Sequence, residues 1–175
     1  MSTELEIREI QPDEYETLGR LMVEVYSNLE GFPKPDEQPD YYEALANIGQ
    51  FTEQDHTQVL IALSADGKLL GGVVYFSDMS MYGSGGTATG VKNASGIRLL
   101  GVDPNARGAG VGRALTDACI QQARDRGQAE VVLHTTMAMQ VAWALYLKLG
   151  FERSPDLDFH QEDLPVFGFR LRLGS

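Results

Sequence analysis

The sequence pattern of residues 96–123 predicts a buried strand, a glycine-rich turn and an amphipathic helix in direct succession. Residues 97–102 form a nearly continuous apolar run, which is typical of a strand buried on both faces. Pro104 ends this strand because proline has no amide hydrogen to donate to a neighbouring strand. Apolar residues then recur at helical spacing, at Val111, Leu115, Ala118, Cys119 and Ala123. This pattern predicts a helix that packs back onto the strand before it.

Three glycines in the turn, Gly108, Gly110 and Gly112, indicate an anion-binding site. Glycine lacks a Cβ, so a ligand can approach the backbone closely. The first amide groups of the following helix have no partner within the helix, and they carry the positive end of its dipole. Arg107 and Arg113 flank the turn. The sequence therefore predicts that the turn binds a phosphate or pyrophosphate.

The spacing of these glycines differs from two common nucleotide motifs. A dinucleotide fingerprint needs a third glycine three residues after the second, but Arg113 and Leu115 stand at the two positions where it could fall. No lysine follows in the position that a Walker motif requires. A protein that binds a nucleotide phosphate unrelated to coenzyme A stays open as an alternative on these residues alone.

Two motifs resemble those of the GCN5-related N-acetyltransferase (GNAT) superfamily. Residues 107–112, RGAGVG, are similar to the family's R/Q-x-x-G-x-G/A loop, and residues 99–104, LLGVDP, look like the strand before it. Residues 142–151, AWALYLKLGF, look like the second motif, AxxLYxxLGF. The matched core covers residues 96–153. The resemblance implies that acetyl-coenzyme A (acetyl-CoA) binds as the acyl donor, with its pyrophosphate on the glycine loop.

The resemblance and the anion site together give a set of expected cofactor-binding residues on the central strand, the glycine loop and the second motif. They are Leu100, Gly101, Val102, Arg107, Gly108, Ala109, Gly110, Val111, Gly112, Arg113, Met139 and Ala142.

At 175 residues with 43% hydrophobic content, the chain is expected to be a single α/β domain, residues 1–175. We expect strands at residues 4–10, 59–63, 69–77, 97–102, 130–135, 151–153 and 166–173. Helices are expected at residues 12–29, 40–48 and 137–149 and from residue 111 to a cap at residues 126–127, and residues 156–163 are expected to form an acidic loop. The resemblance implies a GNAT-like fold, with a central mixed, mostly antiparallel sheet flanked by about four helices. Such a sheet is splayed in the middle, here beside the strand ending at His134, and the thioester enters the split.

Acetyl transfer to an amine requires a neutral amine, a polarised carbonyl group and a proton for the departing thiolate. Tyr146 suits the last task, because its phenol has a pKa of about 10, near that of a thiol. The resemblance implies the same role for this residue. A backbone N–H at Leu100 or Val102 is expected to polarise the carbonyl. The alternative for Tyr146 is a packed aromatic residue whose hydroxyl only orients the cofactor.

The general base is less clearly marked in the sequence. Many family members carry a glutamate on or just before the central strand, where this chain has Ser95 and Gly96. The strand ending at His134 is similar to that of protein N-terminal acetyltransferases, whose histidine serves as a base through water, which implies this role for His134. Met139 replaces an asparagine of those proteins, so we expect one cofactor hydrogen bond to be missing. The alternatives are a structural His134 and His160 as the base.

Aromatic residues outside the matched core are the candidates for the acceptor pocket. The resemblance implies that residues 12–50 border this pocket, and plain packing is the alternative for the aromatic residues there. The candidates in this segment are Phe32, Tyr41 and Tyr42. Residues 78–95 are rich in glycine, serine and threonine, with Tyr82 as the only large aromatic residue. This loop either folds over the acceptor site or is disordered without function.

The net charge of −11 is concentrated in the N-terminal third. Residues 1–60 hold 14 acidic and 3 basic side chains, whereas the rest of the chain is balanced. Such a surface repels nucleic acid and anionic lipid, so neither is expected as a partner. It favours a cationic acceptor such as an amine, or it is an ordinary solvated face.

The remaining composition limits the compartment and the chemistry. No apolar run reaches the roughly 20 residues of a membrane span, and residues 1–11 are charged, unlike a signal peptide. We therefore expect a cytoplasmic protein. Cys119 is the one cysteine, which excludes an intrachain disulfide framework and predicts a buried thiol. No metal-ligand spacing occurs, so no metal is expected, and the resemblance leaves a homodimer open.

Two functions stay open on these observations. The leading interpretation is an acetyl-CoA-dependent N-acetyltransferase, which transfers the acetyl group to a primary amine of a small molecule or peptide by direct attack in a ternary complex. The alternative is an acyl-CoA-binding sensor or regulatory module without transferase activity, suggested by the missing glutamate and asparagine. The motifs encode neither the acceptor nor the length of the acyl chain.

Overall fold

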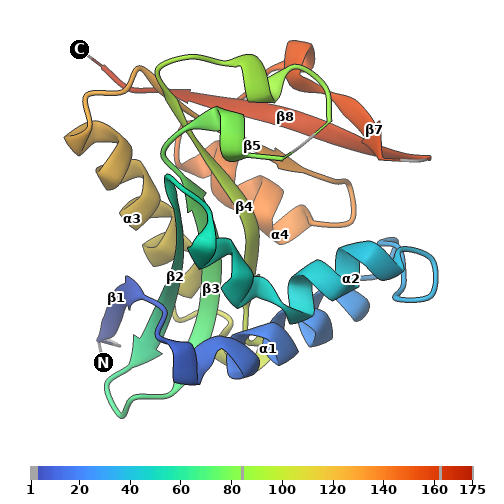
Figure 1. The fold of residues 1–175 in the computed structure, drawn as a ribbon, viewed down its shortest axis with the longest axis vertical. Helices are drawn as coiled ribbons and strands as arrows, with labels where there is room; N and C mark the ends of the chain where they lie inside the picture. The colour runs from blue at the N-terminus through green and yellow to red at the C-terminus, as the bar shows by residue number, and fades with distance from the viewer. Residues whose placement is uncertain (1–3, 84, 162, 175) are drawn as a thin grey trace.

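The computed structural model describes residues 4–83, 85–161 and 163–174. The strands in this part of the chain are β1 (Leu5–Glu9), β2 (Thr57–Ser64), β3 (Leu69–Phe76), β4 (Ala94–Val102), β5 (Glu130–Thr135), β6 (Glu152–Arg153), β7 (Phe159–Gln161) and β8 (Leu164–Arg172). The α-helices are α1 (Tyr15–Ser27), α2 (Pro39–Ala46), α3 (Val111–Asp125) and α4 (Gln140–Lys148). Figure 1 shows α1 and α2 side by side in the lower half of the view, with α1 in front of the sheet.

The strands form one mixed sheet in the order β1-β2-β3-β4-β5-β8-β6, and β7 pairs with β8. Among the described strands, β4 and β5 are the one parallel pair. Their pairing begins at Ala94 with Glu130 and stops at Ile97 with Leu133, although both strands continue. In Figure 1, β8 runs across the view whereas β2 and β3 run from top to bottom. The predicted fold class, a mostly antiparallel sheet splayed in the middle and flanked by about four helices, is confirmed.

The backbone of β4 itself opens the sheet. Leu99 has a φ of +58°, a left-handed conformation that costs a residue with a Cβ about 1 kcal/mol. Opposite it, the pairing of β3 with β4 shifts register between Gly72 and Val74. Such an irregularity bends a strand and increases its twist. The second half of β4 therefore stays paired with β3 and diverges from β5.

The helices cover the two faces of the sheet separately. Helices α1 and α2 form one apolar cluster with the sheet, which includes Leu18, Met22 and Val132. Helices α3 and α4 form a second cluster on the other face, which includes Leu115 and Cys119. Cys119 is fully buried, as the sequence predicts, and burial raises the pKa of its thiol.

Two predicted boundaries near the C-terminus are wrong. Helix α4 begins at Gln140 rather than at residue 137, because the chain first makes a turn in which Met139 donates its N–H to the Thr136 carbonyl. The predicted acidic loop contains a short 3-10 turn and the strand β7. Phe159 pairs opposite Val166, so β8 satisfies the backbone groups of this segment.

Residues 78–95 are ordered in the described part of the segment. Two 3-10 turns, Met79–Met81 and Ala88–Gly90, precede the start of β4, and Tyr82 is fully buried between them. A Cβ at Gly96 would lie 2.4 Å from the Tyr82 ring. Glycine at this position therefore lets Tyr82 lie directly on β4. Packing thus explains why this chain has Gly96 in the region where many family members carry a glutamate.

Gly19 lies where α1 contacts α2, and it provides a test of the packing of these helices. A Cβ at this position would lie 2.1 Å from the backbone oxygen of Ala46. We expect Gly19→Ala to lower the free energy of unfolding by about 1–3 kcal/mol, although alanine is the better helix former. Gly90→Ala is the control, because a Cβ there meets nothing within 4 Å. Urea denaturation measures both variants, and equal stability of the two would contradict the packing.

Candidate active site

The glycine loop exposes the N-terminus of α3. Gly108 and Gly110 have φ values of +86° and +81°, and a Cβ at either position would meet nothing within 4 Å. The first helical bond runs from the Ala114 amide to the Gly110 carbonyl at 2.9 Å. Among the described residues, the three amides at positions 111–113 have no backbone partner. These N–H groups point to an anion site at the positive end of the helix dipole.

This loop packs against the end of β4 and against α4. A Cβ at Gly112 would lie 3.5 Å from Leu145 and 3.7 Å from Val102, which is ordinary contact. Arg107 is exposed, and Arg113 makes one exposed ion pair at 3.6 Å. Two positive side chains thus flank the free amides on the surface beside β4.

A cavity of about 390 Å³ lies in the gap where β4 and β5 separate. Its walls come from both faces of the sheet. Walls on the side of α1 and α2 include Tyr26, Phe32, Tyr41, Tyr82, Leu99 and His134. Walls on the side of α3 and α4 include Ile97, Leu100, Ala142 and Tyr146. Two ligands that approach from opposite faces of the sheet can therefore meet in this gap.

Three of the four aromatic residues predicted for the acceptor pocket line this cavity. They are Phe32, Tyr41 and Tyr82. The rings of Phe32 and Tyr41 lie 5.7 Å apart, and burial raises the pKa of Tyr41 to about 12. Tyr42 does not belong to the lining, and its hydroxyl donates to the Pro33 carbonyl at 2.7 Å. Tyr42 therefore packs the loop before α2 instead of forming a wall.

The predicted cofactor residues divide between the loop, the cavity and the core. Leu100, Met139 and Ala142 line the cavity. Gly101 faces α1, because a Cβ there would lie 2.4 Å from the sulfur of Met22. Close packing against α1 therefore accounts for this glycine without a ligand.

Tyr146 comes from α4 and is only 4% exposed. Its ring packs 5.7 Å from that of Phe151, which holds its orientation. Among the described residues, its hydroxyl has no hydrogen-bond partner, and the ring lines the cavity. Burial raises the pKa of this phenol, so it stays protonated at neutral pH. A protonated hydroxyl in the gap can donate to a ligand there.

His134 has both ring nitrogens bonded within the protein. Its Nε2 lies 2.8 Å from the Leu157 carbonyl, which only accepts, so Nε2 carries the proton. Its Nδ1 then accepts from the Tyr82 hydroxyl at 2.9 Å. Burial, followed by the positive charge of Arg98, lowers the pKa of this imidazole. The arrangement favours the structural alternative over a base that contacts the amine directly.

The lowered pKa of His134 makes stability depend on pH. Below about pH 6.5 the unfolded chain takes up a proton on this imidazole that the folded chain resists. The free energy of unfolding therefore falls as the pH decreases through that value. We expect His134→Gln, which cannot titrate, to show a smaller fall between about pH 7.5 and about pH 5.5 in urea denaturation. An equal fall in both proteins would contradict this account.

Sequence reasoning missed several lining residues, among them Arg98 and Thr136. Arg98 is the single charged residue in the apolar run of β4, and this signal was sufficient to find it. Thr136 gives no such signal, because its position depends on where β5 ends. Its Oγ1 is a buried atom without a hydrogen-bond partner in the described part of the chain. Both side chains offer hydrogen-bond donors to a ligand in the cavity.

The described residues hold neither a cluster suited to a metal ion nor a helix suited to a membrane. No group of three or more histidine, cysteine, aspartate or glutamate side chains is placed to hold a metal ion among them. No helix in the same residues combines the length and the apolar character that crossing a membrane requires.

This α/β fold combines a free helix N-terminus, an opened sheet and a cavity in the opening. The arrangement suits a ligand whose phosphate lies at the helix and whose other end enters the gap. The sequence model described as the Acetyltransferase (GNAT) family matches residues 12–151, and the chain belongs to this family. The family predicted from the two motifs is therefore confirmed.

Sequence relatives are similar over part of their length. Mycothiol acetyltransferase of Saccharomonospora viridis is 30% identical over 126 residues, which covers 71% of this chain and 40% of that protein. Human N-acetyltransferase 8B is 43% identical over 61 residues, or 35% of this chain and 27% of that protein. The chain thus spans less than half the length of the curated relatives it matches.

Solved structures are similar over nearly the whole chain. An acetyltransferase of the GNAT family from Staphylococcus aureus Mu50 has a TM-score of 0.73 at 19% identity, covering 98% of this chain and 100% of that one. PaiA N-acetyltransferase from Thermoplasma acidophilum, solved in complex with coenzyme A, has a TM-score of 0.71 at 18% identity. That match covers 97% of this chain and 99% of the other. At this level of identity the likeness shows the fold.

Proposed function

We propose that this chain transfers an acetyl group from acetyl-CoA to a primary amine, with residues 1–175 acting as one domain. The cavity in the gap between β4 and β5 carries this proposal, because residues from both faces of the sheet line it. Family membership supports acetyl transfer, and the PaiA relative with coenzyme A bound supports acetyl-CoA as the donor. The acceptor is a small molecule or a peptide that reaches the cavity from the side of α1 and α2.

Residues at the N-terminus of α3 and residues in the cavity fit two different parts of acetyl-CoA. The free amides at residues 111–113, with Arg107 and Arg113, would hold the pyrophosphate. Leu100, Met139 and Ala142 would contact the arm that enters the gap. A backbone N–H at Leu100 or Val102 would polarise the thioester carbonyl, because β4 is no longer paired with β5 there.

Tyr146 is the proposed proton donor in this reaction. The amine nitrogen forms a bond to the acetyl carbon, the carbon–sulfur bond breaks, and the sulfur leaves with the electron pair. Tyr146 gives its phenolic proton, or a strong hydrogen bond, to that sulfur. Its free hydroxyl and its place in the lining support this role.

In the proposed reaction, His134 accepts the proton of the amine through Tyr82. The Tyr82 hydroxyl donates to Nδ1 of His134, so its oxygen has lone pairs left to accept a proton from the amine. The amine proton would pass to the Tyr82 oxygen while the Tyr82 proton passes to Nδ1. This pair would replace the carboxylate that many family members carry on the central strand.

Release of free thiol from acetyl-CoA tests the proposal against the sensor alternative. The purified chain is incubated with acetyl-CoA and separate panels of small amines, amino acids and peptides. Thiol release that depends on one class of acceptor supports the transferase. Tight binding of acetyl-CoA without release in any panel supports an acyl-CoA-binding module. Protection from melting by ATP or NAD but not by coenzyme A would contradict both.

A further inference from the structure

Arg98 places a positive charge in the wall of the cavity. It lies on β4 and lines the cavity beside Tyr82, whose carbonyl accepts from its Nη1 at 3.0 Å. Its guanidinium carbon lies 6.0 Å from the centroid of the Tyr82 ring. One nitrogen of the fork is therefore anchored, and the remaining N–H groups are left for another partner.

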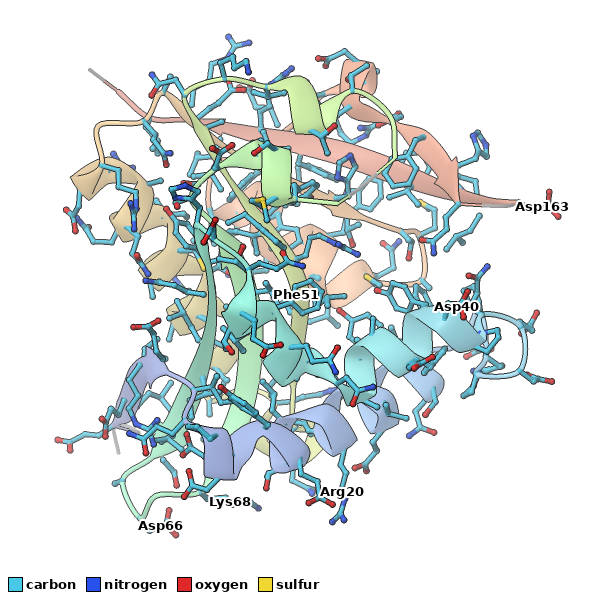
Figure 2. All side chains as sticks on the ribbon, viewed as in Figure 1. Arg20, Asp40, Phe51, Asp66, Lys68 and Asp163 are labelled. Atoms are coloured by element: carbon cyan, nitrogen blue, oxygen red, sulfur yellow. The ribbon has the colours of Figure 1, made fainter. Side chains whose placement is uncertain are left out.

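No acidic side chain of the described residues neutralises this charge. None of their carboxylates lies within 4.0 Å of Arg98, and none of the described residues that line the cavity is aspartate or glutamate. Acidic residues such as Asp40 and Asp163 are exposed, and Figure 2 shows Asp163 at the edge of the molecule. The described lining thus contains an arginine and no carboxylate, although the whole chain carries a net charge of −11.

The effect of Arg98 on its neighbours is consistent with this location. Its charge acts to lower the pKa of Tyr41, Tyr82 and His134, all of which line the cavity. Arginine stays charged at every physiological pH. A partly buried guanidinium beside an aromatic ring, with no carboxylate of the described residues near it, favours an anionic partner.

Thr136 adds a second donor that lacks a partner. It is 4% exposed and lines the same cavity, and its Oγ1 has no hydrogen-bond partner among the described residues. A buried hydroxyl that stays unpaired costs free energy, so a ligand that accepts from it is favoured. Arg98 and Thr136 together provide charged and neutral donors to one acidic group.

The position of Arg98 limits how far this acidic group lies from the reacting amine. Arg98 is two residues before Leu100, whose N–H is one of the two proposed contacts of the thioester carbonyl. Both residues line the cavity, so a carboxylate near the amine lets one acceptor reach Arg98 and the thioester together. One arginine fork suits a carboxylate, whereas a phosphate normally takes several cationic or helix N-terminal donors.

We propose that the acceptor is a primary amine with a carboxylate close to it, of the α-amino acid class, and that Arg98 binds the carboxylate with Thr136 as a further donor. This inference rests on the proposed acetyl transfer. It excludes simple polyamines and amides as preferred acceptors. It also replaces the cationic acceptor that the acidic N-terminal third suggests, because local charge in the cavity governs binding there.

Matched acceptors test the proposal in turnover. Each natural L-amino acid is compared with its amide and with the amine that lacks the carboxyl group. We expect the best amino acid to exceed both counterparts about 100-fold in kcat/KM. Equal kcat/KM for the three forms, or preference for the amine, would overturn the inference while leaving acetyl transfer intact.

Substitutions of Arg98 test whether this residue causes the preference for the amino acid over its amide. Arg98→Met keeps an unbranched apolar stem and removes the guanidinium charge, and we expect the ratio of amino acid to amide to fall from about 100 to about 1. Arg98→Lys should restore part of this ratio. Arg20→Met is the matched control, because Arg20 is exposed on α1 (Figure 2), and it should keep the ratio of the native protein. An unchanged ratio in Arg98→Met would overturn the inference.

A binding experiment that needs no turnover distinguishes failure of this inference from failure of the proposed function. N-acetyl amino acids and their amides are titrated into the native protein with coenzyme A present, and the melting temperature is followed. Stabilisation by the carboxylate form alone, lost in Arg98→Met, supports the inference without any turnover. No thiol release with any acceptor contradicts the transferase. Stabilisation by neither form, or by both equally, overturns the carboxylate site.

Discussion

Tyr146→Phe is expected to lower kcat about 100-fold and to leave the affinity for acetyl-CoA nearly unchanged. Removal of a general acid costs roughly two orders of magnitude or more in rate. The hydroxyl has no partner among the described residues, so its loss leaves no protein group unsatisfied. The phenyl ring keeps its packing against Phe151. Steady-state kinetics with a saturating acceptor and direct titration of acetyl-CoA measure the two quantities.

Tyr75→Phe is the matched control for this prediction. Tyr75 is also fully buried, but it lies outside the cavity and its hydroxyl is 2.6 Å from Ser95 Oγ. Loss of that hydroxyl should reduce stability and leave kcat within about twofold. An unchanged kcat in Tyr146→Phe would remove Tyr146 from the mechanism. A weaker affinity for acetyl-CoA at unchanged kcat would favour the alternative in which the hydroxyl only orients the cofactor.

Gly110→Glu is expected to weaken binding of acetyl-CoA about 100-fold. The site has a φ of +81°, a conformation that disfavours a residue with a Cβ by about 1–2 kcal/mol. A side chain fits there sterically, because its Cβ would meet nothing within 4 Å. The added carboxylate would stand beside the free amides of α3 and repel the pyrophosphate. Isothermal titration with acetyl-CoA measures the change.

Gly127→Glu separates the charge effect from backbone strain. Gly127 has a φ of +70° and equally open surroundings, but it follows the other end of α3. A helix of that length puts the two sites roughly 22 Å apart. We expect comparable loss of stability in both variants and unchanged binding of acetyl-CoA in Gly127→Glu. Equal binding by the two variants would show that the glycine loop does not hold the donor.

The sequence predicted the fold because local and family signals agreed. The apolar run of β4, the helical stripe of α3 and the motif around Tyr146 define the region where the sheet opens. The boundary of α4 and the strand β7 were missed for a shared reason. Both are set by hydrogen bonds that apolar periodicity does not encode: a turn closed by the bond from Met139 to Thr136 in one case, and the pairing of Phe159–Gln161 with β8 in the other.

The candidate site was predicted less completely than the fold. Tyr82 could be named as an aromatic residue in a glycine-rich segment, but its bond to His134 joins residues 52 positions apart. The consequence of Gly96 for Tyr82 is likewise a contact across the fold. Arg98 was missed although it is the one charged residue in an apolar strand, and its lack of an acidic partner among the described residues becomes evident only when the lining is known. Charge counted along the chain therefore favoured a cationic acceptor, whereas the charge in the cavity favours an acceptor that carries a carboxylate.

A crystal structure of the chain with acetyl-CoA tests the central claim most directly. The account predicts pyrophosphate oxygens at about 2.7–3.2 Å from the amide nitrogens of residues 111–113, with the thioester in the gap between β4 and β5 beside Tyr146. A pyrophosphate bound elsewhere, or a thioester that stays outside the gap, would contradict it.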